Sequence, residues 1–190
     1  IVCYQNPDEF IRIPLPEDRS IKGVESRGGH IYLLLEGGNV YHSNLQQETE
    51  LKYVAKMSYS GNFYQKVYLD TDYNLWSFIP HSSEDNLRRL DADAGSFVCV
   101  RDDDGTAINY VTDILDDNKG NLWISTDNAG IIILDKTDGC WSKIKVKEND
   151  LYALPSNHIN CLYLDYQDVM WVGTSKRGVA YTCLNKVLFE

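Results

Sequence analysis

Long apolar runs are missing from this sequence of 190 residues. A membrane-spanning helix needs about 20 consecutive apolar residues, whereas the longest runs here are Ile31–Leu35 and Ile131–Leu134. No signal peptide is visible, and the chain starts with Ile-Val-Cys rather than Met. Because the chain also stops inside the apolar run Lys186–Glu190, we expect it to be a piece of a longer protein, in which missing targeting segments carry no information.

Basic residues are also scarce. The chain has 18 Lys and Arg against 28 Asp and Glu, which gives a formal net charge of −10. Proteins that bind nucleic acids usually present a basic face to the phosphates. This balance therefore argues against a nucleic-acid partner.

The five cysteines lack any metal-binding spacing. Cys3, Cys99, Cys140, Cys161 and Cys183 form no C-x-x-C pair and no Cys/His pattern of a zinc site. Cys99, Cys161 and Cys183 lie in apolar, strand-like runs, which favours free and buried thiols. The odd number excludes complete pairing within one chain, but Cys161 and Cys183 could form a disulfide if their strands are neighbours and their side chains share a face.

Catalytic and metal-binding motifs are missing too. There is no Ser/His/Asp order and no nucleophile elbow, and the histidines are dispersed at positions 30, 42, 81 and 158. Asp102–Gly105 resembles part of a calcium loop, but Thr106–Asn109 does not supply the later ligands that such a loop needs. We therefore expect an acidic turn there, and no catalytic residue, metal site or cofactor in this chain.

What the sequence does contain is a repeat marked by tryptophan. Each copy has an Asp six residues before the Trp, and the copies are Asp70–Trp76, Asp117–Trp123 and Asp165–Trp171. The three Trp residues are 47 and 48 residues apart, and a diverged copy, Ser26–Tyr32, ends 44 residues before Trp76. Self-similarity at a period of this size indicates a repeat architecture.

Each repeat contains four short strand-like runs separated by turn residues. In the third repeat these runs are Ile108–Leu115, Asn121–Thr126, Gly130–Asp135 and Cys140–Val146. Evenly spaced short strands with one aromatic motif per four strands predict an all-β fold, the β-propeller, in which each repeat is one four-stranded blade. The Trp, or Tyr32 in the first repeat, is then expected to pack between blades, and Asp70, Asp117 and Asp165 to accept backbone N–H bonds in the turn that each opens.

The predicted organisation is a single β-propeller fragment over residues 1–190, an open arc or part of a larger ring. It has about four blades plus a half-blade: two strands of a preceding blade in residues 1–15 (Ile1–Gln5 and Phe10–Ile13), then blades over 20–57, 66–101, 108–146 and 157–190, the last strand being truncated. An isolated arc exposes two apolar blade faces. We therefore expect the fragment to self-associate, two arcs joining head to tail into a homodimer with a two-fold axis.

The segments Asp116–Ile131 and Asp165–Val179, together with the leader Leu154–Ile159, resemble the two-component regulator propeller repeat, whose core reads roughly D-x-x-G-N-L-W-I-G-T-x-x-x-G-L. In that family the repeats build two seven-bladed propellers, the periplasmic sensor of hybrid two-component systems in gut Bacteroidetes. They precede a β-sandwich, a membrane helix, a histidine kinase and a response regulator, and they respond to oligosaccharides. The second repeat departs from the pattern at Ser77–Pro80, and the first has Tyr32 for Trp and Leu35 for Thr.

Propeller ligands usually bind on the face that carries the blade-to-blade connections and the loops between second and third strands. In this chain the polar candidates there are Asn157, His158, Asp127, Asn128 and the Ser175–Arg177 loop with Lys176 and Arg177. Asn, Asp and Arg side chains suit sugar hydroxyl groups. The alternative is that these polar loops form only a solvated rim.

The resemblance favours a non-catalytic, periplasmic fragment of a sensor that detects an oligosaccharide and acts with the remaining blades and downstream domains of the same receptor. Two other classes stay open. One is an enzyme of the propeller-lyase type, which the lack of a repeated His disfavours, and the other is a scaffold for protein interactions.

Overall fold

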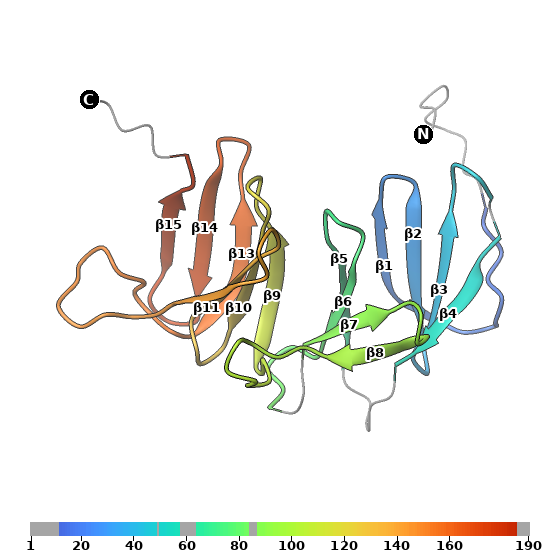
Figure 1. Ribbon diagram of the computed structural model, residues 1–190, viewed down its shortest axis with the longest axis horizontal. Coiled ribbons are helices and arrows are strands. Elements are labelled where there is room, and N and C mark those ends of the chain that lie inside the picture. The colour runs from blue at the N-terminus through green and yellow to red at the C-terminus, as the bar shows by residue number, and fades with distance from the viewer. Residues whose placement is uncertain (1–11, 49, 58–63, 84–86, 186–190) are drawn as a thin grey trace. The chain divides into compact units, whose positions relative to one another are not determined.

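The computed structural model describes residues 12–48, 50–57, 64–83 and 87–185 (Figure 1). These ranges contain fifteen β-strands and no helix, so none that is long and apolar enough to cross a membrane. The strands form four antiparallel sheets in which neighbours in the chain are neighbours in the sheet. This is the up-and-down meander of a propeller blade, as the sequence predicts.

The strand bounds follow the repeats. The first sheet contains β1 (Ile21–Arg27), β2 (His30–Leu35), β3 (Asn39–Asn44) and β4 (Lys52–Lys56). The second contains β5 (Lys66–Leu69), β6 (Leu75–Phe78), β7 (Arg88–Asp91) and β8 (Ser96–Cys99). The third contains β9 (Val111–Asp116), β10 (Asn121–Thr126), β11 (Ile131–Asp135) and β12 (Trp141–Ile144), and the fourth β13 (Ile159–Leu164), β14 (Val169–Thr174) and β15 (Val179–Cys183).

The observed ends differ from the predicted ends by a few residues, because strands stop where turn residues take over. The third repeat shows this at both ends: its first strand begins at Val111 rather than Ile108, and its last runs only to Ile144. The truncated last strand that the sequence predicts for the fourth blade would begin at Val187, and so it lies outside the described residues, as do Ile1–Gln5 and most of Phe10–Ile13. Arg12 and Ile13 are not in a strand.

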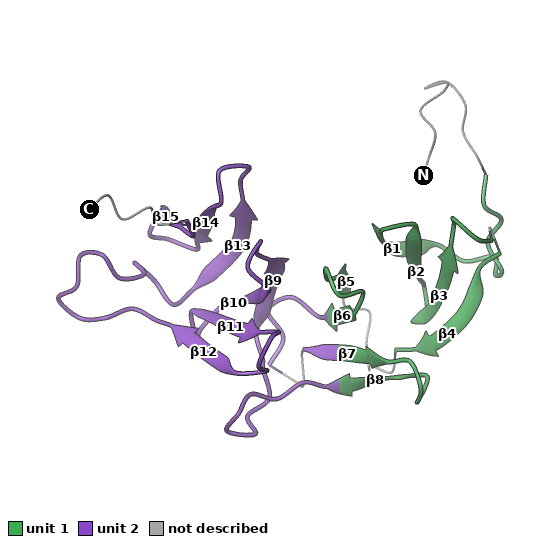
Figure 2. Ribbon diagram, turned by 45° about the horizontal axis from the view of Figure 1, so that its top comes forward, with its two compact units in different colours: residues 1–77, 89–98 green, residues 78–88, 99–190 purple. Residues whose placement is uncertain are grey.

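The chain divides into two compact units (Figure 2). Unit 1 comprises residues 1–77 and 89–98, and unit 2 comprises residues 78–88 and 99–190. The division runs through the second sheet, so that the loop between β6 and β7 belongs to unit 2.

The core of unit 1 lies between its two sheets. It joins side chains of the first sheet to those of β5, β6 and β8; its buried members are Leu34, Val40, Ala55, Met57, Val67, Leu69, Leu75 and Phe97. Gly23 on β1 permits this close approach, because a Cβ at that position would meet the Val67 side chain at 3.0 Å. Tyr32, which replaces the Trp in the first repeat, is partly buried against the same cluster.

The core of unit 2 is built in the same way between the third and fourth sheets. Its buried members are Trp123, Ile131, Ile159, Leu162, Met170 and Val172. Trp123 is contributed by the third sheet and packs against side chains of β13 and β14. Trp123 therefore lies between blades, as the sequence predicts, whereas Trp171 on the fourth sheet is 38% exposed.

The cysteine predictions require correction. Cys161 on β13 and Cys183 on β15 are both free and exposed rather than buried. Both strands pair with β14, where Cys161 lies opposite Gly173 and Cys183 opposite Val169. The two strands are thus not neighbours, and a disulfide between these residues is excluded, since the strand spacing of about 4.8 Å places them two strands apart.

Candidate ligand-binding loops

Each Asp of the repeat is bonded to its own Trp. The indole N–H donates to the Oδ2 atom of the Asp six residues earlier, over 2.8 Å in Asp70–Trp76, 2.9 Å in Asp117–Trp123 and 2.8 Å in Asp165–Trp171. The other carboxylate oxygen accepts backbone N–H bonds from the turn, as predicted. The sequence pattern missed the bond to the indole, which satisfies a donor that would otherwise be buried without a partner.

Asp165 and Asp117 have lowered pKa values. The hydrogen bond from Trp171 lowers the pKa of Asp165 below its ordinary value. Burial acts to raise the pKa of Asp117, but hydrogen bonds from the Asn121 and Trp123 side chains and from backbone amides outweigh burial, so this pKa is also lowered. Both carboxylates are therefore held in the charged form that accepts these bonds.

The acidic stretch that begins at Asp102 forms a related turn with a different partner. Asp102 Oδ1 accepts the backbone N–H groups of Asp104 and Thr106 at 3.1 and 2.9 Å. Its Oδ2 atom lies 2.6 Å from Lys143 Nζ, and this bond lowers the pKa of Asp102. A structural turn thus accounts for this acidic run without a calcium ion.

At the opposite end of β10 the chain enters a short loop fixed by Thr126. The Thr126 hydroxyl donates to Gly130 O at 2.9 Å and accepts the Ala129 N–H at 2.9 Å. The loop after β14 is the same: Thr174 donates to Gly178 O at 2.8 Å and accepts the Arg177 N–H at 3.0 Å. Each T-x-x-x-G sequence therefore builds a preformed loop between the second and third strands of its blade.

The loop glycines have positive φ angles, and Gly130 is also tightly enclosed. Gly130 has φ 79°, and a Cβ there would lie 2.2 Å from Ile144 O. Gly178 has φ 77°, but a Cβ there would meet no heavy atom within 4 Å. Only glycine adopts this backbone at low cost, and at Gly130 only glycine fits.

Two histidines converge on Asp127 at the start of the first of these loops. His81 Nδ1 lies 3.1 Å from Asp127 Oδ2, and His158 Nδ1 lies 3.4 Å from Oδ1 and 2.5 Å from the backbone oxygen of Asp127. The His81 and His158 side chains are 55% and 63% exposed, against 33% for Asp127. The carboxylate thus orients the His81 ring, and the Asp127 backbone oxygen is the nearer partner of the His158 ring. Both rings remain accessible to solvent.

Backbone bonds hold the loops of three consecutive repeats in place around this cluster. Asp127 N–H donates to Tyr110 O at 2.9 Å, and Tyr110 N–H donates to Ser82 O at 2.8 Å. On the other side, Ser175 N–H donates to His158 O at 2.9 Å. His81 and Tyr110 adopt positive φ angles of 62° and 55°, which L-residues rarely take and which are common at functional sites.

The predicted ligand residues fare differently in this geometry. Asp127 and His158 are brought together, and the loop with Lys176 and Arg177 follows Ser175 beside His158. Asn157 has a structural task instead: its Oδ1 atom accepts the Val146 N–H at 2.9 Å and its backbone oxygen accepts the Gly130 N–H at 3.0 Å. Asn128 is exposed in its loop.

His81 was missed by the sequence prediction. It lies in the diverged second repeat, where Ser77–Pro80 departs from the family pattern, so no register connected it to the other loops. A signal was present, because His81 follows the second strand of its repeat as Asp127 follows the second strand of the next.

The chemistry available to this cluster is polar recognition. When each Nδ1–H donates to Asp127, the Nε2 atom of a neutral imidazole is an acceptor for a ligand hydroxyl. Among the residues that the structure describes, no three His, Cys, Asp or Glu side chains are arranged to hold a metal ion. The loops thus offer donors and acceptors at fixed positions.

Sheets in meander order, packed face against face within each unit, define the class of this chain as a β-propeller. More narrowly, two of its segments, residues 105–128 and 153–176, match the family model of the two-component regulator propeller. The two matches include the Asp117–Trp123 and Asp165–Trp171 motifs. They also include the candidate loop residues Asp127, Asn128, Asn157, His158 and Lys176.

The chain is similar in fold to several solved structures. The extracellular domain of a putative hybrid two-component system from Bacteroides thetaiotaomicron matches with 23% identity and a TM-score of 0.52 over 82% of this chain and 19% of that one. A second such domain from that organism matches with 18% identity and a TM-score of 0.57 over 87% of this chain and 25% of that one. The present chain thus spans a quarter or less of the length of these relatives.

A computationally designed protein, Ika4, matches with 9% identity and a TM-score of 0.53 over 89% of this chain and 94% of that one. No curated protein matches the chain.

Proposed function

We propose that this chain is a non-catalytic part of the extracytoplasmic, periplasmic sensor region of a hybrid two-component system, and that its loop face binds an oligosaccharide. The observation that carries the proposal is the Asp127 carboxylate with His81 and His158 on either side, at the ends of preformed loops. Two family repeats and the similarity in fold to extracellular domains of such systems support it.

The loops suit a polyhydroxyl ligand. Asp127, His81 and His158 present accessible donors and acceptors, and the neighbouring Lys176 and Arg177 add further donors. A sugar chain that contacts both histidines bridges loops of different repeats in unit 2. Binding to one arrangement of these loops favours that arrangement, and in the proposed receptor this bias is transmitted to the histidine kinase.

Thermal-shift measurements test the proposal with defined oligosaccharides prepared from pectin, arabinan, mannan and heparin. We expect at least one of them to raise the melting temperature, since a ligand that binds only the folded state stabilises it. Asp127→Ala should abolish the shift, because the ligand loses the carboxylate and the His81 ring loses the group that orients it. Asp138→Ala is the matched control: Asp138 is an exposed turn carboxylate that accepts one backbone N–H, from Cys140.

The outcomes separate the other classes of function. Release of product from a glycan in the same mixtures would indicate an enzyme and contradict the non-catalytic role. If no oligosaccharide shifts the melting temperature, or if the shift survives Asp127→Ala, the proposed sugar site is wrong, and a scaffold becomes the better explanation.

A further inference from the structure

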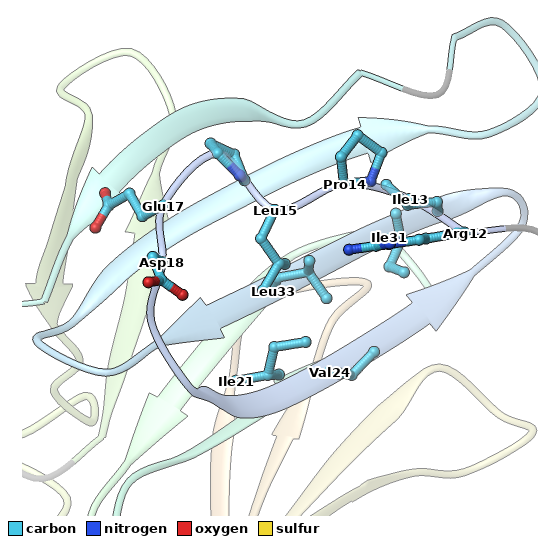
Figure 3. Close-up of a pocket in the computed structure, with 11 residues that line it drawn as sticks. Arg12, Ile13, Pro14, Leu15, Glu17, Asp18, Ile21, Val24, Ile31 and Leu33 are labelled. Atoms are coloured by element: carbon cyan, nitrogen blue, oxygen red, sulfur yellow. The ribbon is translucent and has the colours of Figure 1, made fainter.

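The first sheet carries different side chains on its two faces. On one face, Ile31 and Leu33 border a groove of about 690 Å³ that lies under residues 12–18 (Figure 3). Successive side chains of a strand point to opposite faces, so His30 and Leu34 belong to the other face. Leu34 is buried in the core that the first sheet forms with the second. The face that packs on the second blade therefore includes a histidine at the start of β2.

A second histidine, His42 of β3, is hydrogen-bonded to the first, and the two residues form the histidine pair. His30 Nδ1 lies 2.8 Å from His42 Nε2, and the ring centroids are 5.1 Å apart with an angle of 18° between the ring planes. Because the two nitrogens are much closer than the two centroids, the rings meet edge to edge, and one nitrogen donates a hydrogen bond to the other. Zinc–nitrogen bonds of about 2.0–2.1 Å would set the nitrogens of a tetrahedral site roughly 3.3 Å apart, so this spacing suits a shared proton rather than a metal ion.

Two tyrosine rings cover the histidine pair, one from each blade of unit 1. The centroid of the Tyr73 ring, in the turn between β5 and β6, lies 5.0 Å from that of the His30 ring. The centroid of the Tyr32 ring on β2 lies 4.5 Å from that of the His42 ring. Gly28 lets the Tyr73 turn come close, because a Cβ at this position would collide with the Tyr73 hydroxyl group. The histidine pair thus lies where a turn of the second blade rests on the first blade.

Four charged side chains lie on the strands and the turn beside the histidine pair: Glu25, Arg27, Glu48 and Lys52. Both acids have other partners. Glu48 accepts hydrogen bonds from Lys52 at 2.7 and 2.8 Å, and Glu25 accepts one from the Leu69 backbone. Arg27 is paired with His30 in register and donates to Leu69 O over 3.3 Å. Within the described part of the chain, neither imidazole is hydrogen-bonded to a carboxylate that could balance a second positive charge.

The histidine pair can accept one additional proton at low cost but not two. Burial lowers the pKa of His42, and the positive charge of His30 lowers it further, against the opposing effect of Glu48. Since the two rings interact directly, protons bind in two steps that belong to the pair as a whole. The first additional proton leaves one donor and one acceptor and makes a charge-assisted bond. The second leaves two donors without an acceptor, and two like charges repel across the short distance between the rings.

We propose that the histidine pair is an acid-sensitive switch between the two blades of unit 1. While it carries no more than one additional proton, the bonded rings hold the Tyr73 turn of the second blade against the first sheet. A second proton drives the rings apart and releases that turn. Histidine suits this task because its charge changes between about pH 5 and pH 8, and histidine protonation changes interfaces in other pH sensors.

The melting temperature measured from pH 8 to pH 5 tests this proposal. The folded-state pKa of His42 is lowered, so its contribution to stability is fully present above the unfolded-state pKa of about 6.5 and is lost as the pH falls through the folded-state value. We expect the melting temperature of the wild type to fall by about 2–4 °C over this range, in which the turn carboxylates remain charged. His42→Gln should remove this fall, because glutamine can bond to His30 but cannot take up a proton.

The other two histidines of the chain supply the matched control. A double variant, His81→Gln with His158→Gln, leaves the histidine pair intact and should retain the fall. Far-UV circular dichroism at pH 8 verifies that each variant is folded. A wild type whose melting temperature is level between pH 8 and pH 5 would overturn the proposal, as would a fall that persists in His42→Gln.

Nuclear magnetic resonance of the wild type separates a switch from a merely structural bond. The ring signals of His30 and His42 should change in two steps, and those of Tyr73 should shift together with the second step as the turn leaves the His30 ring. Two steps without any change at Tyr73 would show that the histidine pair does not control the turn, and would contradict the proposal. Zinc that raises the melting temperature of the wild type at pH 8, but not that of His42→Gln, would also contradict it and identify a metal site.

Discussion

The Trp123 indole N–H donates to Asp117 Oδ2 over 2.9 Å, and so joins a turn carboxylate to an aromatic ring that lies between two blades. The same carboxylate binds the turn backbone through its other oxygen, Oδ1, at Lys119 N and Asn121 N. One side chain thus fixes both the hairpin and the ring that the next blade packs against.

Removing this carboxylate should destabilise the fold strongly. Asp117→Ala is expected to lower the free energy of unfolding by about 2–4 kcal/mol, because the Trp123 donor and the turn amides lose a charged acceptor in a buried place. Asp138→Ala, which removes one exposed acceptor, should cost well under half of that. Urea denaturation measures both variants, and equal losses would contradict the role assigned to Asp117.

Replacing the repeated Trp should have different effects in different blades. Trp123→Ala is expected to cost about 3–5 kcal/mol, since it leaves a large cavity in the core of unit 2. Trp171→Ala should cost clearly less, because that ring is 38% exposed against 5% for Trp123. Denaturation at low micromolar concentration, where self-association is weakest, is the measurement. A loss at Trp171 as large as that at Trp123 would show that its ring is covered in the monomer.

Glycine substitutions should separate backbone strain from steric exclusion. Gly178→Ala is expected to cost about 1–2 kcal/mol through its positive φ angle alone. Gly130→Ala has the same strain and adds a collision with Ile144 O, so we expect a loss of about 3 kcal/mol or more. Thermal and urea unfolding of the pair provide the comparison. Equal costs would mean that β12 moves aside without penalty.

Stability should fall in acid as the turn carboxylates are protonated. The folded-state pKa values of Asp165, Asp117 and Asp102 lie below their ordinary values. Their contribution is therefore fully present above the unfolded-state pKa of about 4, and it is lost as the pH falls through the lower folded-state values. The melting temperature measured from neutral pH to pH 3 should decline in that acidic range.

Asp165→Asn provides the control for this pH dependence, because it removes one titrating group with little change in size. The melting temperature of this variant should fall less steeply with decreasing pH than that of the wild type. An unchanged slope would show that Asp165 does not contribute.

Much of this fold was predictable because its signals are local. Turn residues at regular spacing located the strands, and the Asp six residues before each Trp predicted the turn bonds. The ends of strands were less certain, since the hydrogen bonds that close a ladder, such as Arg101 with Ala107, leave no mark in composition.

The candidate site was only partly predictable, because the residues that form it are far apart in the sequence. Asp127 and His158 lie in recognisable repeats, whereas His81 reaches them from a repeat whose pattern has drifted. Asn157 has a polar side chain in the expected place, but its side-chain oxygen accepts a backbone N–H, that of Val146, whose position the sequence does not reveal. Likewise, the exposure of Cys161 and Cys183 depends on whether another sheet covers their face, which no residue near them reveals.

The bond between Asp117 and Trp123 also has a consequence for how the chain folds. It closes across six residues, so each hairpin can find its shape before any distant segment arrives, and early contacts of low sequence separation favour rapid folding. Structure can then spread from one repeat to the next as in other linear arrays. Because this stabilising bond lies within one hairpin, a duplicated hairpin retains it. A gene can therefore lengthen the array by copying one repeat.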